Sequence, residues 1–244
     1  MDKALIQKRF GRKLKIYDEN AKIQKQMAEK LVSLLSGKSD FKNILEIGCG
    51  TGLLTKIVSQ KCDFEKYIAN DIVADCGNYI SKINPDIKFI EGDIEKLLVE
   101  TDKKFDLIIS NASIQWIEDF EGFIKKLISK LKTDGILLFS IFGNENFREI
   151  FYVLGKTLKY YSKNELIEMF KDFETTIEEE VRIMAFKSPK DVLKHIQSTG
   201  VNAITTEVWT KKNLSEFEDG YNNFCSGKPT LTYNPIYIKI SSKT

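Results

Sequence analysis

Histidine is almost absent from this sequence, with one residue in 244. The four cysteines include no Cys-x-x-Cys pair, and no cluster of His, Asp and Glu has the spacing of metal ligands. We therefore expect no metal site, whether zinc or another catalytic ion. We expect the cysteines to be free thiols, as in proteins of a reducing cytoplasm.

Long apolar runs are missing as well. No stretch reaches the ~20 apolar residues that a membrane-spanning helix needs, so we expect no membrane partner. Residues 1–3 lead into a charged amphipathic segment where a secretory signal would have an apolar core, which predicts a cytoplasmic location. No repeat, low-complexity tract or linker interrupts the chain, which favours a single domain over residues 1–244.

A large excess of charge of one sign is also lacking, because the net charge is only +2, but the charge is unevenly distributed. Residues 1–30 carry nine Lys/Arg and four acidic residues. A basic arm of this kind attracts an acidic partner at long range, and a solvated helix face is the alternative interpretation. The basic residues at the centre of the arm are Lys8, Arg9, Arg12 and Lys13.

Apolar segments alternate with helical ones along the first 142 residues, the order expected of a parallel α/β sheet. Residues 120–131 carry apolar side chains at helical spacing, and 133–135 (Thr-Asp-Gly) predict a turn into the next strand. The predicted strands span 44–47, 66–70, 87–90, 105–110 and 136–142.

The second part of the chain is less regular. Residues 145–172 predict two helices, the second opened by a capping box of Ser162 and Glu165. Pro235 requires the closing strand to lie near a sheet edge or to break there. We expect a helical arm over 1–36 and a helical insertion over 186–228 that forms part of an acceptor site. The remaining predicted elements are strands over 175–186 and 231–240 and helices over 191–198 and 211–224.

The most informative segment is an apolar strand from Ile44 that runs into Gly48, Gly50 and Gly52. Glycines let the backbone turn tightly and approach a ligand with no Cβ in the way. The helix that follows directs its N-terminus at that ligand. A dinucleotide fingerprint would need its third glycine where Leu53 stands, so the spacing argues against a dinucleotide cofactor.

The pattern Glu-x-Gly-x-Gly-x-Gly from Glu46 to Gly52 resembles motif I of the class I S-adenosylmethionine (SAM) dependent methyltransferases. The resemblance implies SAM as methyl donor and a Rossmann-like α/β fold. That fold has a mostly parallel twisted sheet, helices on both faces and an antiparallel last strand. Glu46 resembles the family acid that orients the glycine loop and the methionine amino group, and a buried carboxylate needs some such partner.

Two acidic residues follow the next predicted strands. Asp71 lies nineteen residues after Gly52, where a carboxylate accepts hydrogen bonds from both ribose hydroxyls. In the resembling family, the acid that matches Asp93 accepts from the adenine amino group, and the next backbone N–H, here that of Ile94, meets the ring. A helix cap is the alternative role of each acid.

Four further residues are candidates for the methionine end of the pocket. Asn111 and Ala112 follow a predicted strand there, with a plain turn as the alternative. Tyr17 and Gln24 are seven residues apart and therefore share one helix face. We expect this helix to cover the pocket and Tyr17 to help position the methionine end and the methyl acceptor. Aromatic packing is the alternative role of Tyr17.

Segments along nearly the whole chain resemble one family in particular, the malonyl-acyl-carrier-protein O-methyltransferases of the biotin pathway. That resemblance implies methylation of a free malonyl carboxylate, with an acyl carrier protein as the partner of the basic arm. The resembling segments include 192–195 and 231–235 (Leu-Thr-Tyr-Asn-Pro), and the most particular ones are 17–28, 111–116 and 199–203 (Thr-Gly-Val-Asn-Ala).

The acceptor chemistry agrees with the scarcity of histidine. A carboxylate with a pKa of ~4 is already ionised at neutral pH, so its methylation needs alignment and exclusion of water rather than a general base. A cation should hold the carboxylate, and Arg148 is the best candidate, with a surface arginine as the alternative. We expect Trp116 to form a pocket wall and His195 to cap or pack rather than to bind the acceptor.

Other functions are less well supported by the sequence. Residues 111–116 lack the Asn/Asp-Pro-Pro-aromatic motif of enzymes that methylate base amino groups, and aromatic and basic residues do not interleave. We therefore expect no nucleic-acid partner. A methyltransferase of another small carboxylic acid, and a SAM-binding partner protein without catalysis, remain as alternatives.

Overall fold

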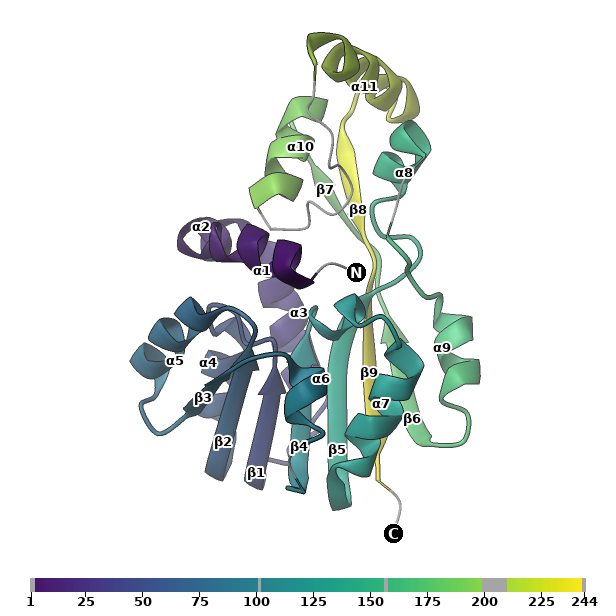
Figure 1. Cartoon of the computed structure of the whole chain (residues 1–244). Coiled ribbons are helices and arrows are strands. Elements are labelled where there is room, and N and C mark those ends of the chain that lie inside the picture. Colours follow the sequence, from purple (N-terminus) through teal and green to yellow (C-terminus); the bar gives the residue numbers. More distant parts are fainter. Residues whose placement is uncertain (1–2, 101, 156–157, 199–209, 243–244) are drawn as a thin grey trace.

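The computed structural model describes residues 3–100, 102–155, 158–198 and 210–242. Within them, seven strands form the central sheet in the order β3-β2-β1-β4-β5-β9-β6 (Figure 1). The first five strands in the chain are parallel to one another, whereas β9 (Pro235–Ser241) runs antiparallel to β5 and to β6 (Glu174–Glu179). This confirms the predicted α/β fold. The parallel strands are β1 (Asp40–Ile47), β2 (Asp63–Asp71), β3 (Lys88–Glu91), β4 (Phe105–Asn111) and β5 (Leu131–Phe142).

Helices cover both faces of the sheet and bury two apolar clusters against it. None of the helices in the described ranges combines the length and apolarity needed to cross a membrane. One face carries α3 (Lys22–Ser33), α4 (Leu53–Lys61) and α5 (Gly77–Ile83). The other carries α6 (Ile94–Leu97), α7 (Phe120–Ser129) and α9 (Lys163–Met169).

Helix α7 shows why the apolar spacing specifies a packed helix. Its residues Phe120, Phe123, Ile124 and Leu127 are all buried, and the opposite side faces solvent. The side chain of Asp119 caps the helix by accepting a hydrogen bond from the N–H of Gly122 at 3.1 Å. The helix predicted from this spacing is confirmed.

Strand β1 lies at the centre of the sheet, between β2 and β4. Its last four residues are buried because helices cover both faces, as expected for an apolar run in a parallel sheet. The chain leaves β1 toward β2 on one side and later returns to β4 on the other. Ligands of open α/β sheets bind at such a reversal, outside the carboxyl ends of the strands.

Two of the predicted strands and one predicted turn differ from the structure. The strand predicted over 175–186 is divided into β6 and β7 (Arg182–Ala185), which belong to different sheets. The closing strand is divided at Asn234 into β8 (Thr230–Tyr233) and β9, the break that Pro235 required. The turn predicted at 133–135 is a bulge inside β5, where Asp134 adopts a positive φ of 59°.

The break between β8 and β9 has a clear physical cause. Asn234 is fully buried, and its amide nitrogen donates to the carboxylate of Glu179 and to the backbone carbonyl of Glu180, each at 3.0 Å. These contacts fix the point at which both chain segments leave the main sheet. Beyond it, β7 and β8 pair with each other as a separate antiparallel ribbon.

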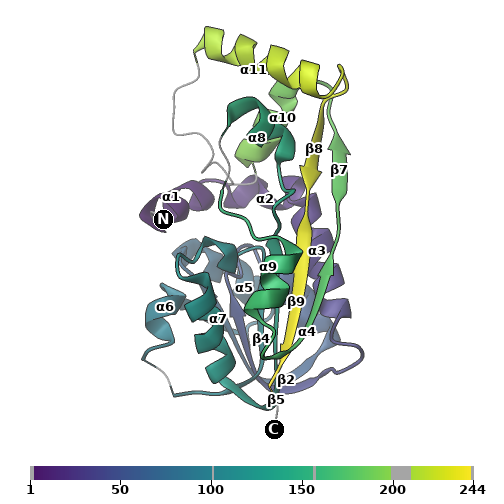
Figure 2. The ribbon, with the colours of Figure 1, turned by 90° about the vertical axis from the view of Figure 1, so that its right-hand side faces the viewer.

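This ribbon and three helices form an upper unit above the carboxyl edge of the sheet (Figures 1 and 2). Between the unit and the sheet lie α1 (Lys3–Gly11) and α2 (Leu14–Asn20), the two helices that begin the arm. The predicted helices over 191–198 and 211–224 are both present, and the segment 199–203 lies outside the described residues. The helices of the upper unit are α8 (Arg148–Leu154), α10 (Pro189–Ser198) and α11 (Lys211–Phe224).

A buried glutamate of α8 forms hydrogen bonds with strand β8 of the ribbon. Glu149 is 2% exposed, and its two carboxylate oxygens accept from the N–H of Thr232 at 2.9 Å and from the hydroxyl of Thr232 at 2.6 Å. Both oxygens of the side chain therefore serve as acceptors for Thr232, a residue of β8. The attachment of α8 therefore depends on this side chain.

We predict that Glu149→Ala lowers the free energy of unfolding by about 2 kcal/mol, because the buried N–H of Thr232 would lose its acceptor. Urea denaturation measures the change. Glu168→Ala, at an exposed position of α9, is the matched control and should change stability by less than about 0.5 kcal/mol. Equal stability of the two variants would contradict the assigned role.

Candidate functional site

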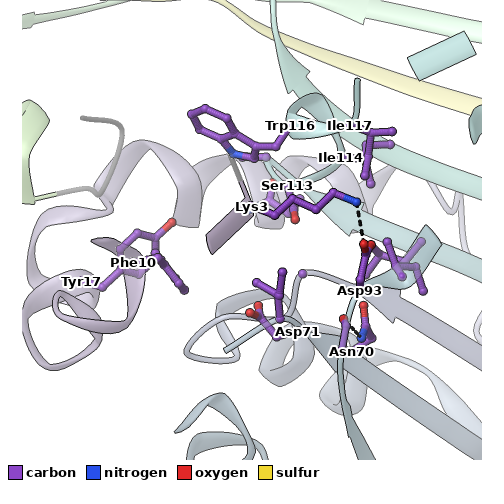
Figure 3. Close-up of a pocket in the computed structure, with 17 residues that line it drawn as sticks. Lys3, Phe10, Tyr17, Asn70, Asp71, Asp93, Ser113, Ile114, Trp116 and Ile117 are labelled. Atoms are coloured by element: carbon purple, nitrogen blue, oxygen red, sulfur yellow. Dashed lines mark hydrogen bonds and ion pairs between the residues drawn. The ribbon is translucent and has the colours of Figure 1, made fainter. Parts of the chain in front are cut away.

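A pocket opens at the carboxyl ends of β1, β2 and β4, beneath α1 and α2 (Figures 1 and 3). It consists of two adjoining hollows that share Tyr17, Gly48 and Asn111. In Figure 3, Phe10 and Tyr17 lie on one side of the first hollow and Asp93 on the other. The first hollow is also lined by Lys3, Asn70, Asp71, Ile94, Ala112, Ser113 and Trp116, and the second by Gln24, Cys49, Gly50 and Thr51.

The glycine loop after β1 forms the floor of both hollows. Gly48 has a φ of 69°, and a Cβ there would lie 1.9 Å from the hydroxyl oxygen of Ser113. Gly52 has a φ of 85°, and its Cβ would lie 2.2 Å from a methyl group of Ile83. Both the backbone conformation and the close neighbours therefore require glycine at these positions. The loop therefore leaves its backbone open to close approach by a ligand.

Asp71 supports this loop from the end of β2. Its Oδ2 accepts from the N–H of Gly50 and its Oδ1 from the N–H of Val73, both at 2.9 Å. Burial raises the pKa of Asp71, and these backbone hydrogen bonds oppose the shift. The Cys76 thiol and the N–H of Ile72 also favour the ionised form, and Asp71 lines the first hollow, where its carboxylate can accept from a ligand hydroxyl.

Asp93 begins α6 at the far side of the first hollow. Its Oδ1 accepts from the N–H of Glu95 at 3.1 Å, and its Oδ2 accepts from Nζ of Lys3 at 2.7 Å. Burial alone would raise the pKa of Asp93, but the Lys3 ammonium and the Glu95 N–H outweigh it and lower the pKa. Asp93 is therefore an ionised acceptor that caps a helix and also faces the hollow.

The second hollow contains an unusual acceptor. Gln24 is 4% exposed, and its Oε1 has no hydrogen-bond partner among the described residues. Its backbone carbonyl accepts from the side chain of Asn111 at 2.9 Å, which fixes α3 against the end of β4. Buried acceptors without a partner are rare and point to a missing donor. An ammonium group of a ligand, with three N–H donors, would supply one.

Comparison with known proteins identifies the family. A family model described as a methyltransferase domain matches residues 17–180. The malonyl-[acyl-carrier protein] O-methyltransferase of Calditerrivibrio nitroreducens is 38% identical over 237 residues, which cover 95% of this chain and 94% of that protein. The chain belongs to the malonyl-[acyl-carrier protein] O-methyltransferase family. The chain is thus a SAM-dependent methyltransferase, which confirms the predicted resemblance and the predicted methyl donor.

Further comparisons agree with this family and fold. The protein of the same name from Chlorobium luteolum is 37% identical over 248 residues, which cover 97% of this chain and 94% of that protein. Among solved structures, the YcgJ protein of Bacillus subtilis superimposes with a TM-score of 0.64, covering 90% of this chain and 99% of that one. At 14% identity, the latter similarity concerns the fold alone.

The two hollows fit the two ends of SAM. The first hollow offers ionised or partly free carboxylates at Asp71 and Asp93, which suit ribose hydroxyls and a nucleobase amino group. The second offers the unpartnered Oε1 of Gln24, which suits the ammonium of the methionine portion. Gly48 lies between them, where the backbone allows close approach.

The structure brings most of the predicted site residues together and leaves three apart. Glu46, at the end of β1, and Gly52, at the end of the glycine loop, are both buried and line neither hollow. Arg148 lies at the start of α8, half exposed, with its guanidinium 3.5 Å from the carboxylate of Glu145. Those that line a hollow are Tyr17, Gln24, Gly48, Gly50, Asp71, Asp93, Ile94, Asn111 and Ala112.

Several lining residues were not predicted from the sequence. Asn70 lies beside Asp71, and its side-chain nitrogen donates to the carbonyls of Ile90 and Gly92 at 3.0 and 2.9 Å, which ties β2 to the loop after β3. Lys3 and Phe10 belong to α1 of the arm. The sequence predicts a docking surface for a partner there, but not residues of the pocket. Their positions depend on tertiary packing, and no local pattern indicates them.

Glu46 has an environment of its own beneath the loop. Its Oε2 accepts from the hydroxyl of Thr55 at 2.8 Å and from the hydroxyl of Tyr67, and its Oε1 has no partner among the described residues. Burial raises the pKa of Glu46 to about 7, although the hydrogen bonds from Tyr67 and Thr55 act in the opposite direction. Because Thr55 belongs to α4, this contact orients the helix that follows the glycine loop.

The raised pKa of Glu46 predicts a pH-dependent stability. The pKa of Glu46 is about 7 in the folded state, and the ordinary glutamate value of 4.5 applies to the unfolded state. Between these two pH values, the folded protein keeps a proton on Glu46 that the unfolded protein has released. The free energy of unfolding should therefore fall as pH rises through this window, by at most about 3 kcal/mol. Urea denaturation at several pH values measures it. Glu46→Gln should remove this component, and an unchanged pH dependence in the variant would contradict the prediction.

Proposed function

We propose that this protein transfers a methyl group from SAM to the free carboxylate of a malonyl thioester on an acyl carrier protein, an early step of biotin synthesis. The observation that carries the proposal is the similarity, along nearly the whole chain, to proteins named for this reaction. The pocket supports it, because its two hollows suit the methyl donor and lie directly below the upper unit.

The chain's contribution to the reaction is positioning. SAM supplies an electrophilic methyl group, and an ionised carboxylate attacks it without a general base. Gly48, Asp71 and Gln24 hold the donor along the carboxyl edge of the sheet. Helices α1 and α2 lie over the pocket and exclude water from it.

Tyr17 is the best-placed residue to align the acceptor with the donor. It lines both hollows, and its hydroxyl has no hydrogen-bond partner within the described ranges. Burial raises the pKa of Tyr17, and the carboxylates of Asp18 and Asp71 add to the shift, so the hydroxyl stays protonated as a donor. A neutral donor orients a carboxylate oxygen while leaving it nucleophilic.

The acceptor would enter between the arm and the upper unit. Helices α10 and α11 of this unit belong to the insertion expected over 186–228. There, Nε2 of His195 lies 2.7 Å from the hydroxyl of Tyr233, and Tyr233 is fully buried. This contact supports an orienting role for His195 within the unit. The position of Arg148 at the surface gives no support to its expected contact with the acceptor carboxylate.

The proposal predicts a strong preference for the carrier-bound substrate. Purified protein with radiolabelled SAM should methylate malonyl-acyl-carrier protein at least about tenfold more efficiently, in kcat/KM, than malonyl-CoA or free malonate, because only the first offers a protein surface as well as the acyl group. The gene should also restore growth without biotin to a strain that lacks the methyltransferase. Equal use of free acids would favour a general small-acid methyltransferase, and SAM binding without turnover would favour a non-catalytic partner.

The basic arm is proposed as the docking surface for the acidic carrier. Lys8 and Arg12 are exposed, and Arg9 and Lys13 are partly buried beside them on the segment that lies over the pocket. An acidic partner held there would face the gap between the arm and the upper unit. Exposed charges steer association over distances comparable with the Debye length, ~10 Å at 0.1 M salt.

We predict that reversing all four charges, with Lys8, Arg9, Arg12 and Lys13 each changed to Glu, lowers kcat/KM for malonyl-acyl-carrier protein at least about tenfold at low salt. The KM for SAM should change less. The control for net charge reverses four exposed lysines on α4, α5 and α7, with Lys56, Lys61, Lys82 and Lys126 each changed to Glu. An unchanged kcat/KM in the arm variant would rule out docking at this surface.

A further inference from the structure

Lys3 is the one cation among the described residues that line the two hollows. Figure 3 shows its side chain extending across the first hollow toward Asp93. Its Nζ lies 2.7 Å from Oδ2 of Asp93 and also binds the carboxylate of Glu95. A residue of the first arm helix is therefore joined to the start of α6, ninety positions further along the chain.

Helix α1 is attached to the pocket at further points. Nε2 of Gln7 donates to the backbone carbonyl of Ile72 at 2.7 Å, and the ring of Phe10 lies against Gly50, 3.2 Å from where a Cβ would be. The rings of Phe10 and Tyr17 then meet edge to face, with centroids 5.0 Å apart. The arm thus runs from the far side of the first hollow to the glycine loop.

These attachments differ in kind. Those of Gln7 and Phe10 are short-range contacts with backbone, whereas the Lys3 contact is an ion pair between charges that remain partly exposed, at 36% for Lys3 and 19% for Asp93. Ion pairs of this exposure weaken as salt concentration rises. Each oxygen of Asp93 can accept a second hydrogen bond, so the carboxylate can hold Lys3 and a nucleobase amino group together.

We propose that Lys3 is a clasp that closes the arm over the bound cofactor and slows its release. The ion pair with Asp93 and Glu95 must break before α1 can lift from the first hollow, while the stem of Lys3 covers the ligand beneath it. The inference depends on SAM binding in this pocket and not on the identity of the methyl acceptor.

The experiment measures the release of S-adenosylhomocysteine, the demethylated product, by stopped-flow fluorescence of Trp116 in the pocket wall or by chase with radiolabelled SAM. Lys3→Met keeps the apolar stem and removes the charge. It should raise the dissociation rate constant about three- to fivefold, the effect of an ion pair of this exposure. In the unmodified protein the rate should rise between 50 and 500 mM NaCl, whereas in Lys3→Met it should not.

Two controls separate the clasp from a general loss of structure. Lys8→Met removes an exposed charge from the same helix and should leave the release rate unchanged. Glu95→Gln should reproduce part of the Lys3→Met effect and add nothing to it in the double variant. A release rate and salt dependence in Lys3→Met equal to those of the unmodified protein would overturn the proposal. Failure of all proteins to bind the product would instead contradict the cofactor pocket, and loss of malonyl transfer alone would leave the clasp intact.

Discussion

The parallel pairing of β1 with β2 is the constraint on which the site depends. It places the backbone carbonyl of Asn70 where the N–H groups of Gly48 and Cys49 both reach it, at 2.8 and 3.0 Å, and it places Asp71 against Gly50. The loop therefore has its ligand-binding shape because its own polar groups are satisfied by the neighbouring strand. Since β1 is buried on both faces, the register cannot shift without exposing its apolar residues. The donor pocket is in this sense a product of the strand pairing.

Much of the cofactor half could be predicted from the sequence because its signals are local. The glycine spacing, the apolar strand before it and the acids after the next two strands each reflect a requirement of one short segment. The apolar spacing of α7 and the capping box of α9 are also local signals, and both are present in the structure. The strand predicted over 175–186 was wrong as a single element, because its division depends on Asn234. No feature within the segment marks the division.

The acceptor side was harder to predict for a related physical reason. The sequence predicts Arg148 near the acceptor because it follows the strand over 136–142, but the direction of α8 is set by Glu149 and by the ribbon it binds, more than eighty positions away. The sequence indicates Lys3 only as one charge of a basic arm, whereas in the structure it lines the pocket and pairs with Asp93. In both cases the sequence identifies the type of residue, and long-range packing decides which surface it faces. Arms and inserted units are held mainly by such contacts, so their residues are the least predictable.

Strand β9 lies between β5 and β6, and β6 pairs with no other strand of the described chain. During synthesis, residues 174–179 therefore cannot join the sheet until residues 235–241 have been made. Their pairing closes a loop of more than fifty residues. The β1–β5 portion can pair from contacts made earlier. The pairing of β9 with β5 joins residues more than ninety positions apart, and contacts of such high sequence separation slow folding. An unfinished chain would thus assemble the donor pocket before the surface that receives the acceptor.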